Sequence, residues 1–196
     1  MKKLAILCSI ILSLIISQTV SAKTIKVPVL GKTNAPVIVE EFFDYQCPAC
    51  QFFHQEIFPT IKEKYIDNGK VKFIYYNFPL SSIHKDAYPA AKFAECSYRK
   101  GGNSKFLKIK NKLYSTMTDG KFDYTTMSKF ATSIGINKND LKKCFDKDTY
   151  KNNISKDIKY GEKAGITGTP GFIVNGTVII GAGEELEETI QSELTK

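Results

Sequence analysis

The sequence predicts an α/β fold, in which helices flank a mixed central sheet and an all-helical subdomain is inserted between the strands. Three observations predict this fold. Strand and helix patterns alternate over residues 37–78, residues 83–160 lack a good strand pattern, and a strand hairpin followed by a helix ends the chain. Strand, helix and strand in this order form a parallel pair with a right-handed crossover.

A strand is predicted from Val37 to Phe43, a mostly apolar run with β-branched members that suits a strand covered on both faces. Glu40 and Glu41 interrupt this run, so one of them must face inward if the strand is central. Apolar residues then recur every four positions, which is the spacing of one helical face. Pro59 lies inside that pattern and is expected to kink the helix.

Helical periodicity continues through the middle of the chain. Gly101-Gly102 is expected to end one helix, and the polar run at residues 137–140 is expected to cap another. Near the end, Asn175-Gly176 lies between two short β-branched runs and predicts a hairpin turn. An amphipathic helix carrying Leu186 and Ile190 follows.

The first 22 residues have the pattern of a cleaved signal peptide. Met1-Lys2-Lys3 is basic, the run from Leu4 to Ile16 is mostly apolar, and Val20-Ser21-Ala22 supplies small residues. The apolar run is shorter than the roughly 20 residues that span a bilayer. We therefore expect cleavage after Ala22 and an exported, periplasmic protein.

The rest of the chain divides into one discontinuous domain and one insert. Residues 23–81 and 162–196 form the predicted α/β domain, and residues 82–161 form the helical insert. The formal net charge is +8, but the lysines are scattered and Arg99 is the only arginine. Because nucleic-acid-binding proteins cluster Lys and Arg on one face, we expect no nucleic-acid partner.

Four cysteines follow the predicted leader: Cys47, Cys50, Cys96 and Cys144. An even count in an exported protein favours disulfides. Cys47 and Cys50 lie at a strand-to-helix junction, the site of a dithiol–disulfide switch. Pro48 suits the first helical turn. The unpaired N–H groups there favour a negative charge on Cys47, and the thiolate is the form that reacts.

The sequence resembles the DsbA-like thiol:disulfide oxidoreductases of the thioredoxin superfamily over nearly all of the predicted mature chain. The segments that carry the resemblance are Ala35-Pro36-Val37, Glu41-Phe42-Phe43-Asp44-Tyr45, Cys47-Pro48-Ala49-Cys50, Asn77-Phe78-Pro79-Leu80, His84 with the Ala-rich helix bearing Cys96, and Gly168-Thr169-Pro170-Gly171-Phe172-Ile173-Val174-Asn175-Gly176. The resemblance implies a thioredoxin fold with an inserted helical subdomain.

The resemblance also implies roles for the cysteine pair. Cys47 is the exposed sulfur that is attacked, and Cys50 is the buried sulfur that resolves the mixed disulfide. Thr169-Pro170 is implied to be a cis peptide packed against the pair. Ala49 departs from the best-known member, which has Pro-His between its cysteines, and this leaves the oxidising strength open.

The resemblance and the predicted export favour a structural disulfide between Cys96 and Cys144, whose alternative is a buried free thiol at Cys144. Glu41 matches a buried acid of the family; it either moves the Cys50 proton or is a solvent-facing acid. His54 and His84 are expected to be surface or packing residues.

Four aromatic residues near the motifs have two possible roles, either lining an apolar peptide groove or filling the core: Phe42, Tyr45, Phe52 and Phe172. We expect no cofactor and no metal, because a zinc ion at Cys47 and Cys50 would need two further ligands.

The resulting hypothesis is an exported oxidoreductase that introduces disulfides into unfolded or reduced exported proteins containing cysteines. A membrane redox partner would reoxidise it. The alternatives are a disulfide isomerase or reductase with the same residues but another redox poise, and a thioredoxin-fold chaperone that only holds unfolded chains. Isomerases are usually dimers, and no dimerisation segment is evident between Lys23 and Pro36, so we expect a monomer.

Overall fold

The computed structural model describes residues 27–117 and 121–196, so the predicted signal peptide lies outside the described residues. One mixed sheet has the strand order β1-β3-β2-β4-β5. Its strands are β1 (Val29–Leu30), β2 (Val37–Phe43), β3 (Val71–Asn77), β4 (Gly171–Val174) and β5 (Thr177–Ile180). Strands β2 and β3 run parallel, and the other neighbouring strands are antiparallel. The predicted α/β fold class is confirmed.

Strand β2 is central and carries one glutamate on each face of the sheet. Glu41 is fully buried, and Glu40 on the opposite face accepts a hydrogen bond from the Tyr160 hydroxyl at 2.9 Å. Successive side chains of a strand point to opposite faces, so Val39 and Phe43 share the face of Glu41. The prediction that one glutamate turns inward is confirmed, and it places a carboxyl group inside the core.

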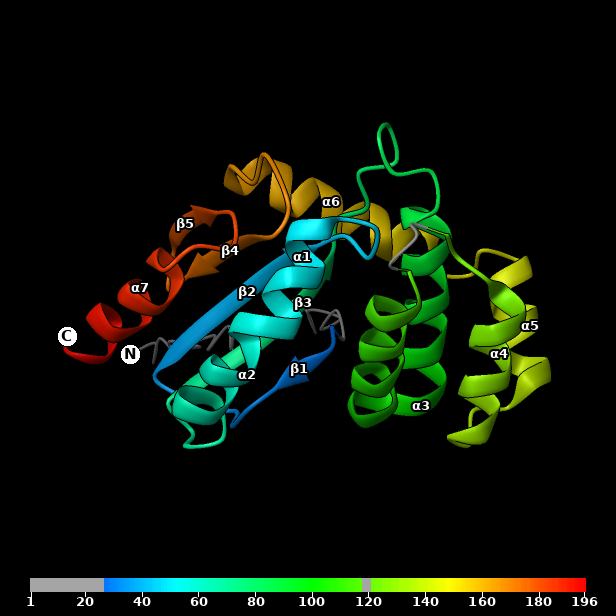
Figure 1. Cartoon of the computed structure of the whole chain (residues 1–196), viewed down its shortest axis with the longest axis horizontal. Helices are drawn as coiled ribbons and strands as arrows, with labels where there is room; N and C mark the ends of the chain where they lie inside the picture. Colours follow the sequence, from blue (N-terminus) through cyan, green and yellow to red (C-terminus); the bar gives the residue numbers. More distant parts are fainter. Residues whose placement is uncertain (1–26, 118–120) are drawn as a thin grey trace, which may run out of the picture.

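One face of the sheet is covered by a helical column and by α7 (Glu185–Leu194) (Figure 1). The column consists of α1 (Pro48–Phe52), η1 (Phe53–Ile57), α2 (Phe58–Ile61) and η2 (Lys62–Ile66). The turns of η1 are wider than those of an α-helix, because the Phe58 N–H donates to the carbonyl of Phe53, five residues earlier. This widening lets the column continue past Pro59, whose ring would clash with the carbonyl four residues before it in a regular α-helix.

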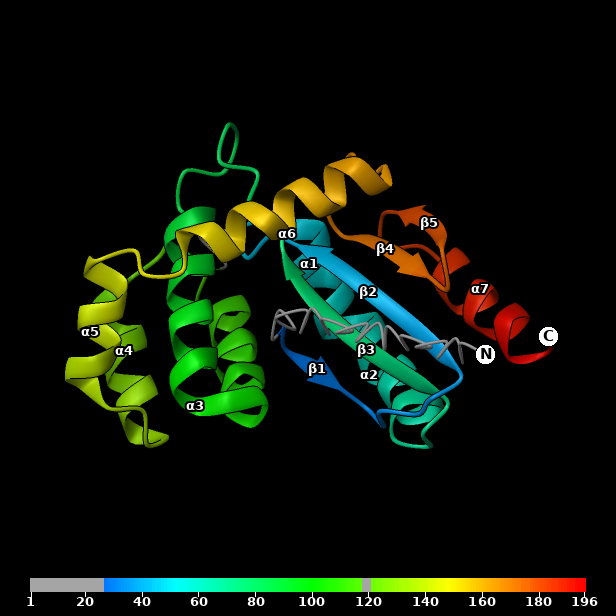
Figure 2. The same ribbon diagram turned by 180° about the vertical axis from the view of Figure 1, so that it is seen from behind.

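The opposite face is covered by α6 (Lys151–Ala164), which crosses the sheet in Figure 2. Gly161 allows this close approach, since a Cβ atom there would lie 2.8 Å from ring atoms of Phe42 and of Phe78. The boundary predicted between residues 161 and 162 falls inside this helix. Helix α6 therefore leaves the insert and also forms a layer of the sheet domain.

The insert consists of α3 (Ala87–Thr116), α4 (Tyr124–Ser133) and α5 (Lys138–Asp146). Helix α3 breaks at Gly102, whose φ of 72° is left-handed, and its two halves lie side by side in Figure 1. The break expected at Gly101-Gly102 is thus confirmed. Within residues 27–117 and 121–196, no helix has the length and apolar character needed to cross a membrane.

Candidate active site

Cys47 occupies the N-cap position of α1, in an extended conformation (φ −73°, ψ 120°), with Pro48 in the first turn. Its carbonyl accepts the Gln51 N–H at 3.1 Å, the first bond of the helix. The N–H groups of Ala49 and Cys50 belong to the first helical turn, where no carbonyl of the helix can accept them. They interact with the Cys47 sulfur instead. Strand β2 and the loop that follows it therefore place the Cys47 sulfur beside the N–H groups of Ala49 and Cys50.

The segment before β4 forms the wall that faces the cysteine pair. The Thr169–Pro170 peptide bond is cis. Sγ of Cys47 lies 3.2 Å from the carbonyl oxygen of Thr169, which accepts a hydrogen bond from Cys47 when this residue is in its thiol form. Strand β4 pairs with β2, so the sheet itself brings residue 169 beside residue 47.

The two sulfurs have opposite acid–base properties. The hydrogen bond from the Cys50 thiol lowers the pKa of Cys47 to about 5, and the side chain of Thr169 and the N–H groups of Cys50 and Ala49 add to this effect. Burial raises the pKa of Cys50 well above its ordinary value, and the bond to Cys47 adds to this effect. At neutral pH Cys47 is therefore a thiolate and Cys50 a thiol. The Ala49 side chain is exposed and adds no polar group to the site.

A chain of buried polar residues starts at Glu41, which is fully buried on β2. Its Oε1 lies 2.6 Å from Nε2 of His54, and the His54 side chain is 3% exposed. Nδ1 of His54 lies 2.7 Å from Nζ of Lys110, and Lys110 is 1% exposed. Burial lowers the pKa of His54 to about 4, so the imidazole is neutral. A neutral ring that donates from Nε2 to the carboxylate accepts from the lysine at Nδ1.

These buried polar contacts decide the expectation for His54 and add a residue that sequence reasoning missed. Of the two expected places, surface or packing, His54 takes the second, and it also links a carboxylate to an ammonium. Lys110 falls on the apolar stripe of α3 between Phe106 and Leu113, four residues from one and three from the other. A lysine at a core position of a helical stripe is the signal that points to a buried, paired cation.

The second histidine stabilises the loop before the cysteines. Asp44 is buried and accepts hydrogen bonds from the N–H of Gln46 at 2.7 Å and of Leu80 at 2.9 Å. Nδ1 of His84 lies 2.8 Å from Oδ2 of Asp44, the same oxygen that accepts from Leu80. Asp44 thus joins the strand end to the start of the insert and holds the approach to Cys47.

The aromatic residues divide between the two predicted roles. Phe42, Tyr45 and Phe172 are buried in the core, and the Phe52 side chain is 53% exposed. Only Phe52, of these four, offers an apolar surface to a ligand, and it lies on α1 next to the cysteine pair.

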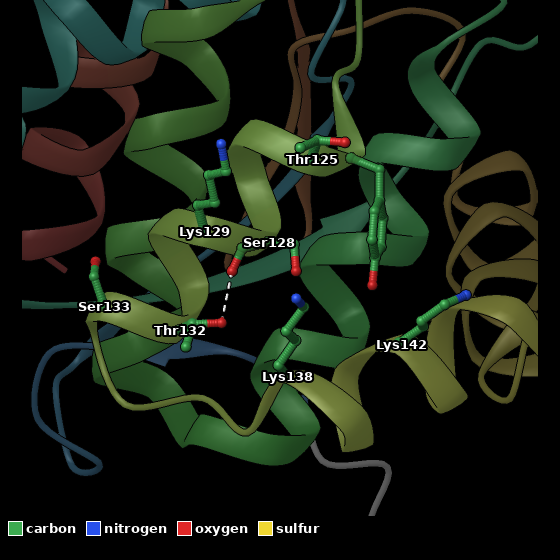
Figure 3. A pocket seen from close by; sticks show the side chains of 8 residues that line it. Thr125, Ser128, Lys129, Thr132, Ser133, Lys138 and Lys142 are labelled. Atoms are coloured by element: carbon green, nitrogen blue, oxygen red, sulfur yellow. Dashed lines mark hydrogen bonds between the residues drawn. The ribbon is translucent and has the colours of Figure 1, made fainter.

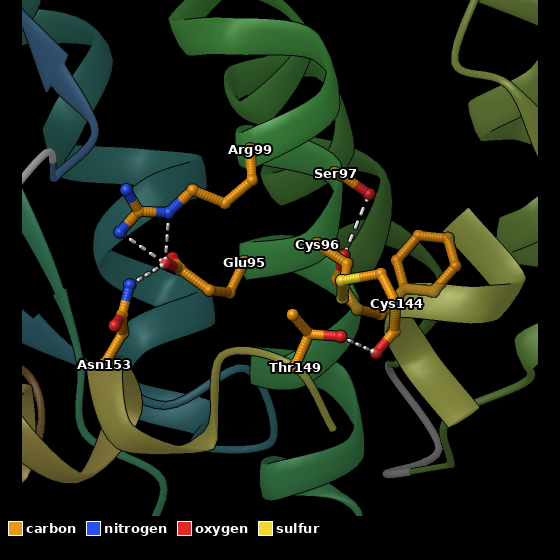
Figure 4. Close-up of a disulfide and its surroundings, with 8 residues drawn as sticks. Glu95, Cys96, Ser97, Arg99, Cys144, Thr149 and Asn153 are labelled. Carbon is orange, nitrogen blue, oxygen red and sulfur yellow. Dashed lines mark hydrogen bonds and ion pairs between the residues drawn. A yellow bond between two sulfur atoms is a disulfide. The ribbon is translucent and has the colours of Figure 1, made fainter. Parts of the chain in front are cut away.

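Cys96 of α3 and Cys144 of α5 are joined by a disulfide that lies in the insert (Figure 4). Beside it, the carboxylate of Glu95 binds Arg99 at 2.8 Å and the amide of Asn153 at 3.1 Å. The disulfide joins two helices of the insert, and the Glu95 contacts extend this connection to α6.

A pocket of about 560 Å³ lies away from the cysteines, between α4 and α5 (Figure 3). Lysines and hydroxyl residues line it, and no member of the cysteine pair does. Among the residues that the structure describes, no group of three or more His, Cys, Asp or Glu residues is placed to hold a metal ion.

A dithiol at a helix start, facing a cis-proline on this mixed sheet, defines a thiol–disulfide exchange protein. Comparisons with known proteins agree. The thioredoxin family model matches residues 23–192. Disulfide bond formation protein D of Bacillus subtilis is 35% identical over 175 residues, covering 85% of this chain and 77% of the relative. The probable disulfide bond formation protein D of Bacillus cereus is 30% identical, covering 85% and 78%.

Solved structures show the same architecture. The crystal structure of oxidised BdbD from Bacillus subtilis aligns with a TM-score of 0.77 at 35% identity, covering 87% of this chain and 94% of that one. The α-DsbA1 structure from Wolbachia pipientis aligns with a TM-score of 0.74 at 23% identity, covering 87% and 92%, and shows the shared fold. The chain therefore belongs to the thioredoxin family, as a DsbA-like protein thiol:disulfide oxidoreductase.

Proposed function

We propose that this protein introduces disulfide bonds into reduced, cysteine-containing proteins outside the cytoplasm, by exchange at Cys47 and Cys50. A substrate thiolate attacks Cys47 Sγ, the Cys47–Cys50 bond breaks, and Cys50 leaves with the electron pair. A second substrate thiolate then attacks the substrate sulfur of the mixed disulfide and displaces Cys47 as a thiolate. The substrate gains one disulfide, and the enzyme is left with two reduced cysteines.

The observation that carries this proposal is the lowered pKa of Cys47, about 5 instead of 9.0. A stable Cys47 thiolate favours the reduced enzyme and so makes its disulfide a better oxidant. An ordinary thiol is protonated at pH 7, so at this pH the stabilisation of the reduced enzyme is set by the difference between pH 7 and the Cys47 pKa of about 5. This difference corresponds to a stabilisation of at most about 2.7 kcal/mol, or about 60 mV for a two-electron couple. Solvent screening reduces this value.

The surroundings of the pair support a polypeptide substrate. The backbone of Thr169 lies beside Cys47 and offers a place where an extended chain pairs as an added strand. The exposed ring of Phe52, on the helix that begins after Cys47, adds an apolar contact. The names of the relatives, disulfide bond formation proteins, agree with this activity.

The signal-peptide pattern of residues 1–22 places the protein, in this proposal, in an exported and periplasmic setting. A membrane redox partner then accepts the electrons from Cys47 and Cys50 and returns the pair to the disulfide. Mass spectrometry of the protein from the exporting cell is expected to show a chain that begins at Lys23.

The direct test measures oxidation of a reduced two-cysteine peptide by the oxidised protein. Wild type is expected to form the peptide disulfide, and Cys47→Ser to lose this activity. The matched control, Cys96→Ala/Cys144→Ala, retains the active pair and should keep the rate. Equal activity of Cys47→Ser and wild type would refute the proposal.

The reduction potential of the couple against glutathione separates the oxidase from its closest alternative. We expect a value more oxidising than the roughly −270 mV of cytosolic thioredoxin. A potential at or below that value would favour the reductase with the same fold and the same cysteines.

A further inference from the structure

The helical insert contributes one buried cation, the ammonium group of Lys110, to the layer that contains the cysteine pair. Lys110 of α3 is 1% exposed, and its Nζ lies 2.7 Å from Nδ1 of His54. The same nitrogen lies 5.3 Å from the ring centroid of Phe58, 5.0 Å from Tyr75 and 5.2 Å from Tyr114. His54 and three aromatic rings thus hold the ammonium group in one place.

Stability alone gives a weak reason for this arrangement. Burial of an ammonium group costs several kcal/mol, and apolar replacements of buried ion pairs are often neutral or stabilising. Burial also lowers the pKa of Lys110, to about 8, and the charges of Glu41 and of Cys50 oppose this effect. Cys50 precedes His54 by four residues on the same helical column, so the Lys110–His54 contact lies about one helical turn from Cys50. At this position the Lys110 cation and a Cys50 thiolate attract each other.

This attraction affects the reaction when the Cys47–Cys50 disulfide is cleaved. As the substrate sulfur bonds to Cys47, the electron pair of the broken bond passes to Cys50 Sγ, which is fully buried. The side chains that titrate around Cys50 and Lys110 are Glu41 on β2, Asp44 and Tyr45 after it, His54 on η1, Tyr75 on β3 and Tyr114 on α3.

None of these neighbours supplies a positive charge. Burial raises the pKa of the Tyr45, Tyr75 and Tyr114 hydroxyls well above the ordinary value, and it keeps His54 neutral. The charge of Glu41 itself disfavours a Cys50 thiolate. Within this group of side chains, the compensating cation is Lys110.

We propose, on the basis of the proposed function, that Lys110 is a positioning residue of the exchange reaction: held by His54 and Glu41, its ammonium group stabilises Cys50 as the leaving thiolate. The S–S bond between Cys47 and Cys50 breaks, a bond from Cys47 to the substrate sulfur forms, and Cys50 carries the negative charge until it takes up a proton. In this proposal Lys110 acts on the reaction through its charge. The insert therefore contributes to the chemistry as well as to the architecture.

The test follows a single turnover of the oxidised protein with a reduced cysteine peptide between pH 6 and 10, by stopped flow. Each rate constant is divided by the thiolate fraction of the peptide, because this removes the pH dependence that comes from ionisation of the peptide itself. For wild type we expect a constant value at low pH and a fall of about tenfold as Lys110 loses its charge near pH 8, since an attraction of about 1–2 kcal/mol is expected between charges several ångströms apart.

Lys110→Met is expected to give a rate about tenfold lower than wild type at pH 7, with no fall near pH 8. The control is Lys108→Met, an exposed lysine on the same helix, which should match wild type at every pH. A Lys110→Met protein that is folded by circular dichroism and matches the Lys108→Met profile would overturn the proposal.

A second measurement decides the matter if Lys110→Met does not fold. Glu41 raises the pKa of Lys110, so Glu41→Gln should move the fall in rate to lower pH. A wild-type profile that stays flat through pH 9, or a fall that Glu41→Gln leaves in place, would overturn the inference. Failure of the proposed function looks different, because wild type itself would then not oxidise the peptide.

Discussion

At the scale of single residues, the two active-site sulfurs differ because of their surroundings. Cys47 is 7% exposed and receives several donors, whereas Cys50 is fully buried. The acidity of Cys47 comes from the Cys50 thiol, Thr169 and backbone N–H groups, and the exposed side chain of Ala49 takes no part. The acidity of Cys47 therefore comes from the helix start and from the facing wall, and the side chain of Ala49 adds nothing to it.

The lowered pKa of Cys47 predicts that the reduced protein is more stable than the oxidised protein at neutral pH. The contribution is complete above about pH 9, the ordinary thiol value, and it disappears as pH falls through about 5. At pH 7 it amounts to at most about 2.7 kcal/mol before solvent screening. Thermal unfolding of both forms between pH 4 and 8 measures it.

The melting-temperature difference between the two forms should grow steadily from pH 5 to 8. In Cys47→Ser the pH dependence that this thiol contributes to the reduced protein should be missing. A wild-type difference that stays constant over this range would show that the Cys47 thiolate is not stabilised by the fold.

At the scale of elements, close packing between α6 and the sheet depends on a glycine. Alanine is ordinarily favoured over glycine inside a helix by about 1 kcal/mol. At Gly161, however, the added Cβ would lie 2.8 Å from ring atoms of both Phe42 and Phe78, and both rings are buried. Overpacking of this kind typically costs about 1–3 kcal/mol, so the steric effect exceeds the helix preference.

We therefore predict that Gly161→Ala lowers the free energy of unfolding by about 1 kcal/mol. Lys163→Ala, at an exposed position of the same helix, should change it by less than about 0.5 kcal/mol. Urea denaturation measures both. A stabilised Gly161→Ala protein would mean that the rings move aside and that α6 has room on the sheet.

At the scale of the whole molecule, the Cys96–Cys144 disulfide joins residues 48 positions apart and closes most of the insert. Loop-closure entropy for this separation gives about 4 kcal/mol of stabilisation. Cys96→Ala/Cys144→Ala should lose a free energy of unfolding of about this size in denaturant titrations. Since the bond lies in the insert, away from Cys47, peptide oxidation by the folded variant should persist at the wild-type rate.

A buried carboxyl at the end of the sheet predicts a further pH dependence of stability. Asp157 of α6 accepts the backbone N–H of Asn77 at 3.1 Å, and burial raises the pKa of Asp157 to about 7. The unfolded chain loses this proton near pH 3.8, whereas the folded protein keeps it up to about pH 7. The contribution of Asp157 is therefore complete below pH 3.8 and is lost as the pH rises through 7.

Asp157→Asn should flatten the decline in unfolding free energy between pH 4 and 7, as followed by chemical denaturation. Asp146→Asn, at an exposed position of α5, serves as the control and should retain the wild-type slope. Parallel slopes in wild type and Asp157→Asn would contradict the assignment of this proton to Asp157.

Local patterns in the sequence predicted most of the elements, because the physics at those positions is local. Asn137 caps α5 by accepting from the N–H groups of Asn139 and Asp140. Asn175 and Gly176 both have positive φ, 44° and 97°, in the turn of the predicted hairpin. The cysteine pair is also local, since a separation of three positions at a helix start brings two sulfurs together.

The sequence by itself thus determined the order of strands and helices from Val37 onward, the break at Gly101-Gly102 and the presence of a dithiol. Only the tertiary structure decided that Lys110 meets His54, 56 positions away, and that Glu41 completes the chain. It also decided that Phe172 lies in the core and that α6 belongs to the sheet. The physical reason is that periodicity reports which face of an element is buried, whereas the partner on that face depends on how distant elements pack.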